Sequence, residues 1–215
     1  MTHGVLHAGN VQSARPMHPF THFSKRLDPS GDGQCQFASV SDQLSTIGIT
    51  VSPEQLRSNV VSFMANEPFM QSHVSGDWNE YLARMTLSHT YGDHLTLFAA
   101  AKLYRVQFVV MSSIGLSGTR IISAEATDEL RSDRPILFLG HYAETGEIRS
   151  EHYVSLSWKG TSSDWTEFIS SLKKKRERHK VQSSAGGSVT VAVQSVQSCT
   201  VALYSCRLCF CLLNV

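Results

Sequence analysis

The sequence has no excess charge of either sign and no long apolar run. Its 215 residues include 19 Lys and Arg against 18 Asp and Glu, which leaves a formal net charge of +1. A chain this close to neutral lacks the basic field that draws nucleic acid to a protein surface. Polar residues interrupt the stretch 189–215, where a membrane span needs about 20 mainly apolar residues. We therefore expect no nucleic-acid partner and no membrane partner.

Cysteine is scarce and unevenly placed. Cys35 stands alone, and the last seventeen residues hold the other four, Cys199, Cys206, Cys209 and Cys211. A secreted disulfide framework would spread its cysteines through the fold. The start of the chain, MTHGVLHAGN, also lacks a basic segment that leads into an apolar run, so we expect no secretory signal. The expected compartment is the cytoplasm, with the nucleus as an alternative.

Changes in composition divide the chain into four segments. Residues 1–19 hold scattered His, Pro, Gly and Ser without periodicity, which is typical of a flexible arm. One domain is expected over residues 20–172, because the chain is long enough for one well-cored domain and short for two. A basic and Gly/Ser-rich linker is expected over 173–188, followed by a poorly ordered tail that contains cysteines over 189–215.

Helix signals fill the first half of this domain. Apolar residues recur every three or four positions after Cys35, which predicts an amphipathic helix that begins at that residue. Further helices are expected after Ser52-Pro53, after Asp77 and after Gly92-Asp93, because each of these offers a capping side chain ahead of an apolar pattern. The first half of the domain is therefore expected to be helical.

Strand signals dominate the second half. Short runs rich in β-branched and aromatic residues lie at 106–111, 119–123, 135–140 and 152–158, each bounded by turn-forming residues. A last helix is expected from Asp164-Trp165. Helices grouped ahead of strands favour an α+β fold, in which helices cover a small sheet, over strict alternation of strands and helices.

Cys35 follows the turn-forming segment DPSGDGQ and starts the first expected helix. Taken alone, this cysteine fits three roles: a small buried side chain, a metal ligand or a nucleophile. A thiol attacks as its thiolate, and a helix N-terminus and a nearby imidazolium both lower the thiol pKa. Gly31 and Gly33 let the chain turn sharply, so N–H groups of this loop are candidates to face a developing oxyanion.

A cysteine nucleophile needs a base, and the chain has ten histidines. Most of them fall in the terminal segments, in connecting segments or in the first turn of a helix, which leaves His141 and His152. His141 directly follows the strand run 135–140 and is expected to begin its exit loop. His152 opens the strand run 152–158, where packing can hold an imidazole toward a cleft, and it is the favoured base.

Three short blocks occur in order across residues 28–158. Asp-Gly-Gln-Cys-Gln-Phe at 32–37 is similar to the motif Asp-Gly-Asn-Cys-Leu-Phe, and Tyr-Gly-Asp-His-Leu-Thr-Leu at 91–97 is similar to an aromatic-Gly-Gly/Asp helix start. Glu-His-Tyr at 151–153 is similar to a C-terminal His-Tyr strand. In this order the three blocks resemble the ovarian tumour (OTU) family of cysteine peptidases.

The resemblance implies a papain-like OTU fold and a deubiquitinase that cleaves the bond after the C-terminal glycine of ubiquitin or a ubiquitin-like protein. Cys35 would be the nucleophile and His152 the base, and loop amides at Gly33 and Gln34 would hold the oxyanion. The implied partners are ubiquitin or polyubiquitin and ubiquitinated proteins. No metal and no organic cofactor is implied, and the sequence says nothing of the oligomeric state.

One departure from the family pattern concerns the group that orients the histidine. Many members carry Asp or Asn two residues after it, and this chain has Val154. Asp32, beside the cysteine, is the candidate replacement, although Asp-Gly is also a common turn pair. Val154 motivates an alternative function, a catalytically weak or inactive OTU-fold module that binds ubiquitin. A zinc site formed by the tail cysteines is a weaker alternative, because their spacing is cramped.

Overall fold

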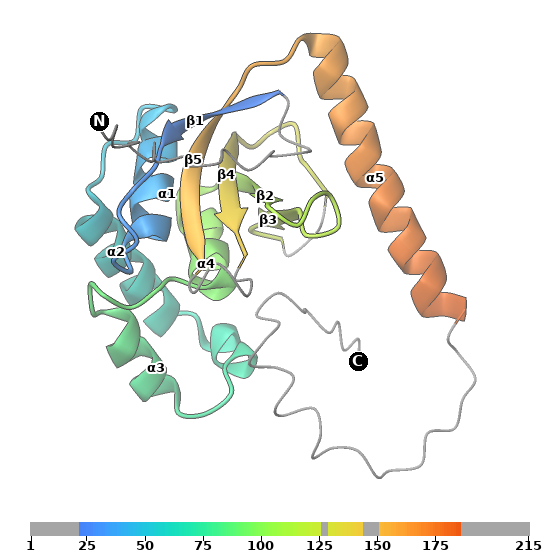
Figure 1. The fold of residues 1–215 in the computed structure, drawn as a ribbon. Coiled ribbons are helices and arrows are strands. Elements are labelled where there is room, and N and C mark those ends of the chain that lie inside the picture. The colour runs from blue at the N-terminus through green and yellow to red at the C-terminus, as the bar shows by residue number, and fades with distance from the viewer. Residues whose placement is uncertain (1–21, 126–128, 144–150, 186–215) are drawn as a thin grey trace, which may run out of the picture.

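The structure is a computed structural model that describes residues 22–125, 129–143 and 151–185 (Figure 1). The arm expected at 1–19 and the cysteine-containing tail expected at 189–215 lie outside the described residues. Side chains of the last helix are described as far as residue 174. No described helix is both long enough and apolar enough to cross a membrane.

A five-stranded mixed sheet forms the centre of the fold. Its strands are β1 (Phe23–Leu27), β2 (Gln107–Ser112), β3 (Arg120–Ser123), β4 (Ile136–Tyr142) and β5 (His152–Trp158). They lie in the order β1-β5-β4-β2-β3, with β2 parallel to β4 and all other neighbours antiparallel. The β5 strand is therefore an inner strand with a neighbour on each side.

The helices are α1 (Cys35–Ser45), α2 (Pro53–Ala65), α3 (Trp78–Met85), α4 (His94–Tyr104) and α5 (Ser162–Ala185), with a 3-10 helix, η1 (Pro68–His73), between α2 and α3. The expected caps are present, because the side chains of Ser52 and Asp77 accept hydrogen bonds from backbone N–H groups three residues on, at 3.2 and 2.8 Å. Asp93 caps α4 in the same way. The four helices expected in the first half of the domain are thus confirmed.

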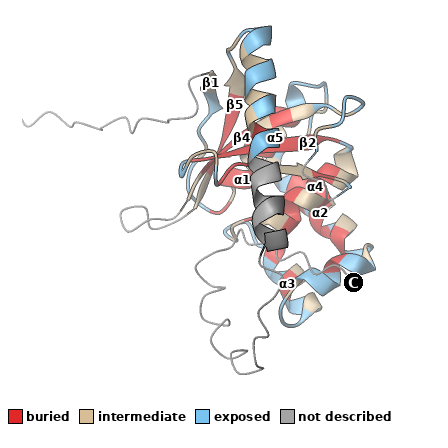
Figure 2. Ribbon diagram, turned by 90° about the vertical axis from the view of Figure 1, so that its right-hand side faces the viewer, coloured by how far each residue is buried: buried red, intermediate tan, exposed pale blue. Residues whose placement is uncertain are grey.

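The helices α1 to α4 lie on one face of the sheet and α5 lies across the other (Figure 1). Alternate residues of β2 show the two faces: Phe108 and Val110 belong to the core beneath α1 to α4, and Val109 and Met111 to a smaller cluster that Phe168 of α5 covers. Burial is concentrated in the sheet and in α1, α2 and α4, whereas α5 stays largely accessible (Figure 2). The expected α+β architecture is confirmed.

Three features differ from the sequence-based expectation. The β1 strand was not expected at all. The β4 strand continues through Tyr142, so His141 is a strand residue, 2% exposed, and does not begin an exit loop. The α5 helix continues to Ala185, so most of the segment 173–188, expected to be a linker, is helical.

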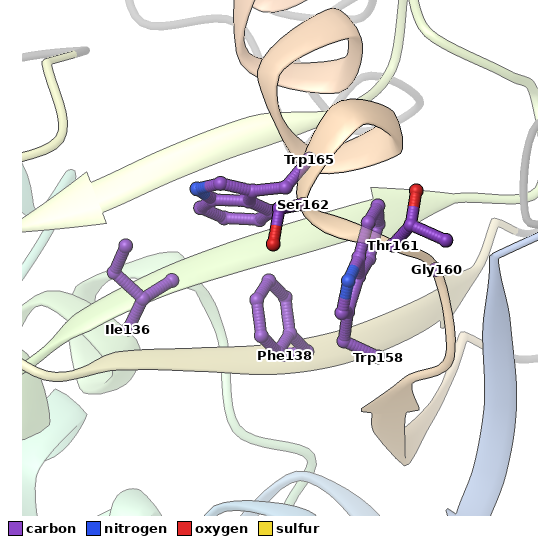
Figure 3. A pocket seen from close by; sticks show the side chains of 7 residues that line it. All are labelled: Ile136, Phe138, Trp158, Gly160, Thr161, Ser162 and Trp165. Atoms are coloured by element: carbon purple, nitrogen blue, oxygen red, sulfur yellow. The ribbon is translucent and has the colours of Figure 1, made fainter.

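A pocket of about 400 Å³ lies between the far face of the sheet and the start of α5 (Figure 3). Its walls are aromatic, with Phe138 and Trp158 from the sheet and Trp165 from the helix. The rings of Trp158 and Trp165 meet edge to face with centroids 5.3 Å apart. None of the residues predicted to act in catalysis lines this pocket.

Candidate active site

Cys35 is the first residue of α1. The preceding residue, Gln34, is the helix N-cap, and its carbonyl accepts the first helical hydrogen bond from Ala38 at 2.8 Å. The helix predicted from the apolar pattern therefore begins at Cys35, as expected. The thiol lies where the partial positive charge of the helix N-terminus is greatest.

The α1 helix packs directly on β5. Gln43 near its C-terminal end donates to the Ser155 hydroxyl at 2.6 Å and to the Leu156 carbonyl at 2.9 Å, and all three residues are buried. These bonds fix the position of the helix along the strand. At the other end of the helix, the backbone N–H of Tyr153 acts on the Cys35 sulfur and lowers the thiol pKa. Tyr153 directly follows His152, the first residue of β5.

The environment of the thiol is less activating than the sequence suggests. Cys35 is 1% exposed, and this burial raises its pKa, an effect larger than the lowering by the backbone N–H groups of Tyr153 and Gln36. The carboxylate of Asp32 raises the pKa further. A lowered thiol pKa was expected from the helix N-terminus, and that expectation is wrong for this structure because desolvation of the thiolate outweighs the helix.

The raised pKa predicts how Cys35 reacts with a small alkylating agent. Because the pKa lies above the ordinary value of 9.0, the thiolate fraction at neutral pH is smaller than in an exposed cysteine and grows as the pH rises through 9. The alkylation rate of Cys35, followed by mass spectrometry of its peptide, is expected to keep rising through pH 9. A rate that is constant between pH 6 and 8 would instead show a preformed thiolate-imidazolium pair.

His152 begins β5 and has one ring nitrogen held in place. Its Nε2 lies 2.9 Å from Oδ1 of Asp28. The side chain of His152 is 22% exposed, so its ring is accessible to a substrate. With Nε2 bound to a carboxylate, the other nitrogen, Nδ1, is the one available to exchange a proton with a thiol.

Asp28 reaches His152 because β1 pairs with β5. The register brings Leu27 opposite Ser155, and the chain leaves the strand at the next residue, Asp28. Lys25 binds the other carboxylate oxygen of Asp28 at 2.6 Å. Partial burial raises the pKa of Asp28, but the hydrogen bonds from Lys25 and His152 outweigh this and the pKa lies below its usual value. Asp28 is therefore a carboxylate at neutral pH.

An acidic residue at position 154 that could orient His152 would require burial of a carboxylate. It is fully buried in the cluster on the α5 side of the sheet, together with Val109 and Leu156. It also packs over Gly140, where an added Cβ would lie 2.6 Å from a Val154 methyl group. A carboxylate in this position would be desolvated among apolar groups, which is unfavourable for a charge. The group that holds His152 comes from β1 instead.

Asp32 does not contact His152. Its carboxylate accepts hydrogen bonds from the Ser30 hydroxyl at 2.7 Å and from the Gln34 backbone N–H at 3.0 Å, within its own turn. Of the three residues predicted to be catalytic, Asp32 therefore has a turn role, while Cys35 begins α1 and His152 begins β5, the strand on which α1 packs. Sequence reasoning missed Asp28, and the only signal for it was an Asp-Pro pair after a short charged run.

Two residues were predicted to form the oxyanion loop. The backbone requires glycine at Gly33, and the N–H of Gln34 is already hydrogen-bonded. Gly33 has φ of 94°, and a Cβ there would lie 2.3 Å from the His89 carbonyl oxygen, so only glycine fits. The Gln34 N–H is engaged by Asp32. This amide can face an oxyanion only when Asp32 releases it, and the role of the loop as an oxyanion hole stays a prediction.

The block at 91–97 packs directly behind the cysteine loop. The side chain of Gln36 donates to the Asp93 carbonyl at 2.9 Å and accepts from the Thr96 hydroxyl at 2.6 Å. Gly92 leaves room for it, because a Cβ would lie 2.2 Å from the Gln36 amide oxygen. The Tyr91 hydroxyl donates to the Gly31 carbonyl at 2.7 Å. The second block of the sequence pattern thus supports the first.

No group of three or more His, Cys, Asp and Glu side chains in the described parts of the chain is arranged to hold a metal ion. The tail cysteines considered for zinc lie outside the described residues.

We expect Asp28→Ala to lower kcat about 10- to 100-fold, less than the roughly 10⁴-fold effect in a serine triad, because thiol chemistry depends less on an oriented base. Asp28→Asn keeps an oxygen that can accept from His152 Nε2 and is expected to lose less. Steady-state hydrolysis of a ubiquitin substrate with a fluorescent leaving group measures both. Asp32→Ala is the matched comparison, and a larger loss of kcat there than in Asp28→Ala would identify Asp32 as the orienting acid.

A buried cysteine at the start of α1, a histidine at the start of the strand on which α1 packs and a carboxylate on that histidine are the groups that a thiol protease uses. Residues 30–153 match the family described as OTU-like cysteine protease, and the chain belongs to this family. The resemblance noted in the sequence is thereby confirmed.

Two curated relatives come from Arabidopsis thaliana. OVARIAN TUMOR DOMAIN-containing deubiquitinating enzyme 10 is 35% identical over 115 residues, 53% of this chain and 31% of the relative. OVARIAN TUMOR DOMAIN-containing deubiquitinating enzyme 12 is 31% identical over 134 residues, 60% of this chain and 54% of the relative. The chain thus spans between about a third and about half of their lengths.

Solved structures share the fold. An OTU deubiquitinase from Wolbachia pipientis wMel superposes with a TM-score of 0.51 at 17% identity, covering 68% of this chain and 96% of that one. The OTU domain of OTUD1 gives a TM-score of 0.50 at 18% identity, covering 63% of this chain and 85% of that one. At these identities the likeness shows the fold, and the expected papain-like OTU fold is confirmed.

Proposed function

We propose that the chain is a thiol-dependent deubiquitinase that hydrolyses the isopeptide or peptide bond after the C-terminal glycine of ubiquitin or a ubiquitin-like protein. The observation that carries the proposal is the hold of Asp28 on Nε2 of His152, at the start of the strand on which the helix of Cys35 packs. The names of the Arabidopsis relatives support the choice of substrate.

The reaction begins with proton transfer. His152 takes the thiol proton of Cys35, and the sulfur attacks the carbonyl carbon of the glycine to form a tetrahedral oxyanion. The C–N bond then breaks, and His152 returns the proton to the departing lysine amine or α-amine. A water molecule, deprotonated by His152, attacks the remaining thioester and releases the ubiquitin carboxylate and the free thiol. Asp28 holds the imidazole through both halves of the cycle.

The alternative, a module that binds ubiquitin without turnover, was motivated by Val154. Asp28 supplies the carboxylate that Val154 cannot, which favours the enzyme. The partners that we propose are ubiquitin or polyubiquitin and ubiquitinated proteins, and the proposed compartment remains the cytoplasm or nucleus on the sequence argument alone.

The test is a ubiquitin probe with a thiol-reactive group in place of its C-terminal glycine carboxylate. The folded chain is expected to form a covalent adduct, and peptide mapping is expected to place it on Cys35 and on none of the tail cysteines. A panel of diubiquitin linkages then measures cleavage. No adduct in a folded sample would overturn the proposal, and binding of ubiquitin without cleavage of any linkage would support the inactive module.

A further inference from the structure

Arg57, in the first half of α2, is a buried cation that forms no direct ion pair with an acidic residue in the part of the chain that the structure describes. The residue is 3% exposed, and no described Asp or Glu lies within ion-pair distance of it, although Asp32 acts on it electrostatically over a longer distance. A buried charge is unfavourable unless it is paired or fully hydrogen-bonded. The place of this guanidinium in the fold therefore requires an explanation.

One side of the guanidinium binds the cysteine loop. Nη2 donates to the Gly33 carbonyl at 2.9 Å, and Nε donates to the side-chain oxygen of Gln34 at 3.1 Å. The guanidinium carbon also lies 4.0 Å from the centre of the Phe37 ring, in the first turn of α1. Arg57 thus contacts the residues on both sides of Cys35.

The other side binds the end of α3 and the segment between α3 and α4. Nη1 donates to the Met85 carbonyl at 3.1 Å, and Nη2 donates to the carbonyls of Ser88 and Thr90 at 3.2 and 2.9 Å. This segment also includes His89, against whose backbone Gly33 packs. The guanidinium therefore joins the cysteine loop to the segment that supports it.

These bonds set the orientation of the peptide unit before the nucleophile. In a trans peptide the C=O and the N–H point in opposite directions. Because the Gly33 carbonyl is directed inward to Arg57, the N–H of Gln34 is directed away from it, toward the Asp32 carboxylate that an oxyanion would have to displace. An amide that is to stabilise an oxyanion must be held in such a fixed direction before the reaction starts.

The charge of Arg57 is also felt at the thiol. Burial lowers the pKa of Arg57, while the negative charges of ionised Cys35 and of Asp32 act in the opposite direction. The guanidinium stays protonated, because arginine does not lose its proton in proteins. A thiolate or an oxyanion that forms at Cys35 is therefore subject to the charge of Arg57, which also acts on the Asp32 carboxylate.

We propose that Arg57 is a positioning residue for the proposed hydrolysis: it fixes the Gly33–Gln34 peptide through the Gly33 carbonyl and the Gln34 side chain, and its charge stabilises the anions that form at Cys35. The inference rests on the proposed function for its effect on turnover. Its effect on the thiol does not depend on any substrate.

Three variants separate charge from geometry. Arg57→Met removes both, Arg57→Lys keeps the charge but cannot reproduce the planar set of donors, and Gln34→Leu removes one acceptor from the loop and leaves the charge. Arg84→Met is the matched control, since Arg84 is an exposed arginine that lies over the Tyr81 ring at 5.7 Å. Circular dichroism and thermal unfolding establish the folded fraction of each variant.

The expected results follow from these roles. Arg57→Met is expected to lower kcat on a ubiquitin substrate about 100-fold or more, as loss of an oxyanion-hole donor does, with KM little changed. It is also expected to shift the pH profile of Cys35 alkylation to higher pH. Arg57→Lys is expected to recover the alkylation profile but not kcat. Gln34→Leu is expected to lower kcat with an unshifted profile, and Arg84→Met is expected to match the wild type.

Other outcomes overturn the inference. A folded Arg57→Met protein with wild-type kcat and alkylation profile would do so, as would lower thermal stability with both quantities unchanged in the folded fraction. If Arg57→Met does not fold, the other two variants test the inference. Arg57→Lys and Gln34→Leu must then both show the loss of kcat stated above. If the wild type cleaves no ubiquitin substrate, the proposed function fails, and the alkylation profiles alone decide on Arg57.

Discussion

Cys35→Ala is expected to abolish hydrolysis of ubiquitin substrates, with a loss of kcat on the order of 10⁶-fold, comparable to removal of the nucleophile from a serine protease. The sulfur forms the covalent intermediate, and alanine offers no atom that can replace it. No other described cysteine is present to substitute for it. Initial rates with a fluorogenic ubiquitin substrate at high enzyme concentration measure the residual activity.

The fold of the Cys35→Ala protein is expected to remain intact. The substitution removes one sulfur atom from a site that is 1% exposed, which costs about 1 kcal/mol of the free energy of unfolding. Ubiquitin binding, measured by calorimetry, is therefore expected to persist while cleavage is lost. Cys206→Ala, in the tail, is the matched control and is expected to keep wild-type activity. Cleavage by Cys35→Ala at more than a trace of the wild-type rate would show that another group is the nucleophile.

The parts of the site that were predicted from sequence lie on elements with strong local signals. The α1 helix has an apolar stripe and a glycine turn before it, and β5 is a run of apolar and aromatic residues that occupies an inner position in the sheet. Burial on both sides of an inner strand requires apolar side chains, so such a strand is visible in the sequence. Cys35 is the first residue of α1, and His152 is the first residue of β5.

Asp28 was missed because β1 was missed. Residues 23–27 read FSKRL, with three exposed positions at the end, and β1 lies at the edge of the sheet. Edge strands carry charged residues, which protect them from pairing with other chains and remove the apolar alternation that identifies a strand. Without β1 there was no reason to bring residue 28 beside residue 152, and the nearer acid, Asp32, was chosen by its position in the motif.

The raised thiol pKa was also beyond the reach of the sequence. A helix N-terminus is a local feature that the pattern predicts, but desolvation depends on what packs around the sulfur. Here the first residue of α1 lies against the start of β5, a contact between positions more than a hundred residues apart. The role of Arg57 could not be predicted for the same reason. A single arginine in an amphipathic helix is expected to be exposed to solvent, and only the packing around it shows that it is buried.

His152→Ala is expected to lower kcat about 10³- to 10⁴-fold, near the upper end of what a general acid-base contributes. The raised pKa of Cys35 makes this base more important, because the thiol is protonated at neutral pH and does not lose its proton unaided. The same imidazole must also protonate the leaving amine. The loss is expected to exceed that in Asp28→Ala, where a base is present but is not held.

Two further measurements identify the missing group as an acid-base catalyst. The residual rate of His152→Ala is expected to rise with pH, because solvent hydroxide then removes the thiol proton that the imidazole took. Added imidazole is expected to restore part of the activity, since the His152 side chain is 22% exposed and its place is open to solvent. A variant that keeps more than about a tenth of wild-type kcat would contradict general-base catalysis by His152, whose usual contribution is at least about 100-fold. In that case the partly exposed ring beside Asp28 serves only to pack the start of β5, and the base must be sought among the other groups that face the thiol.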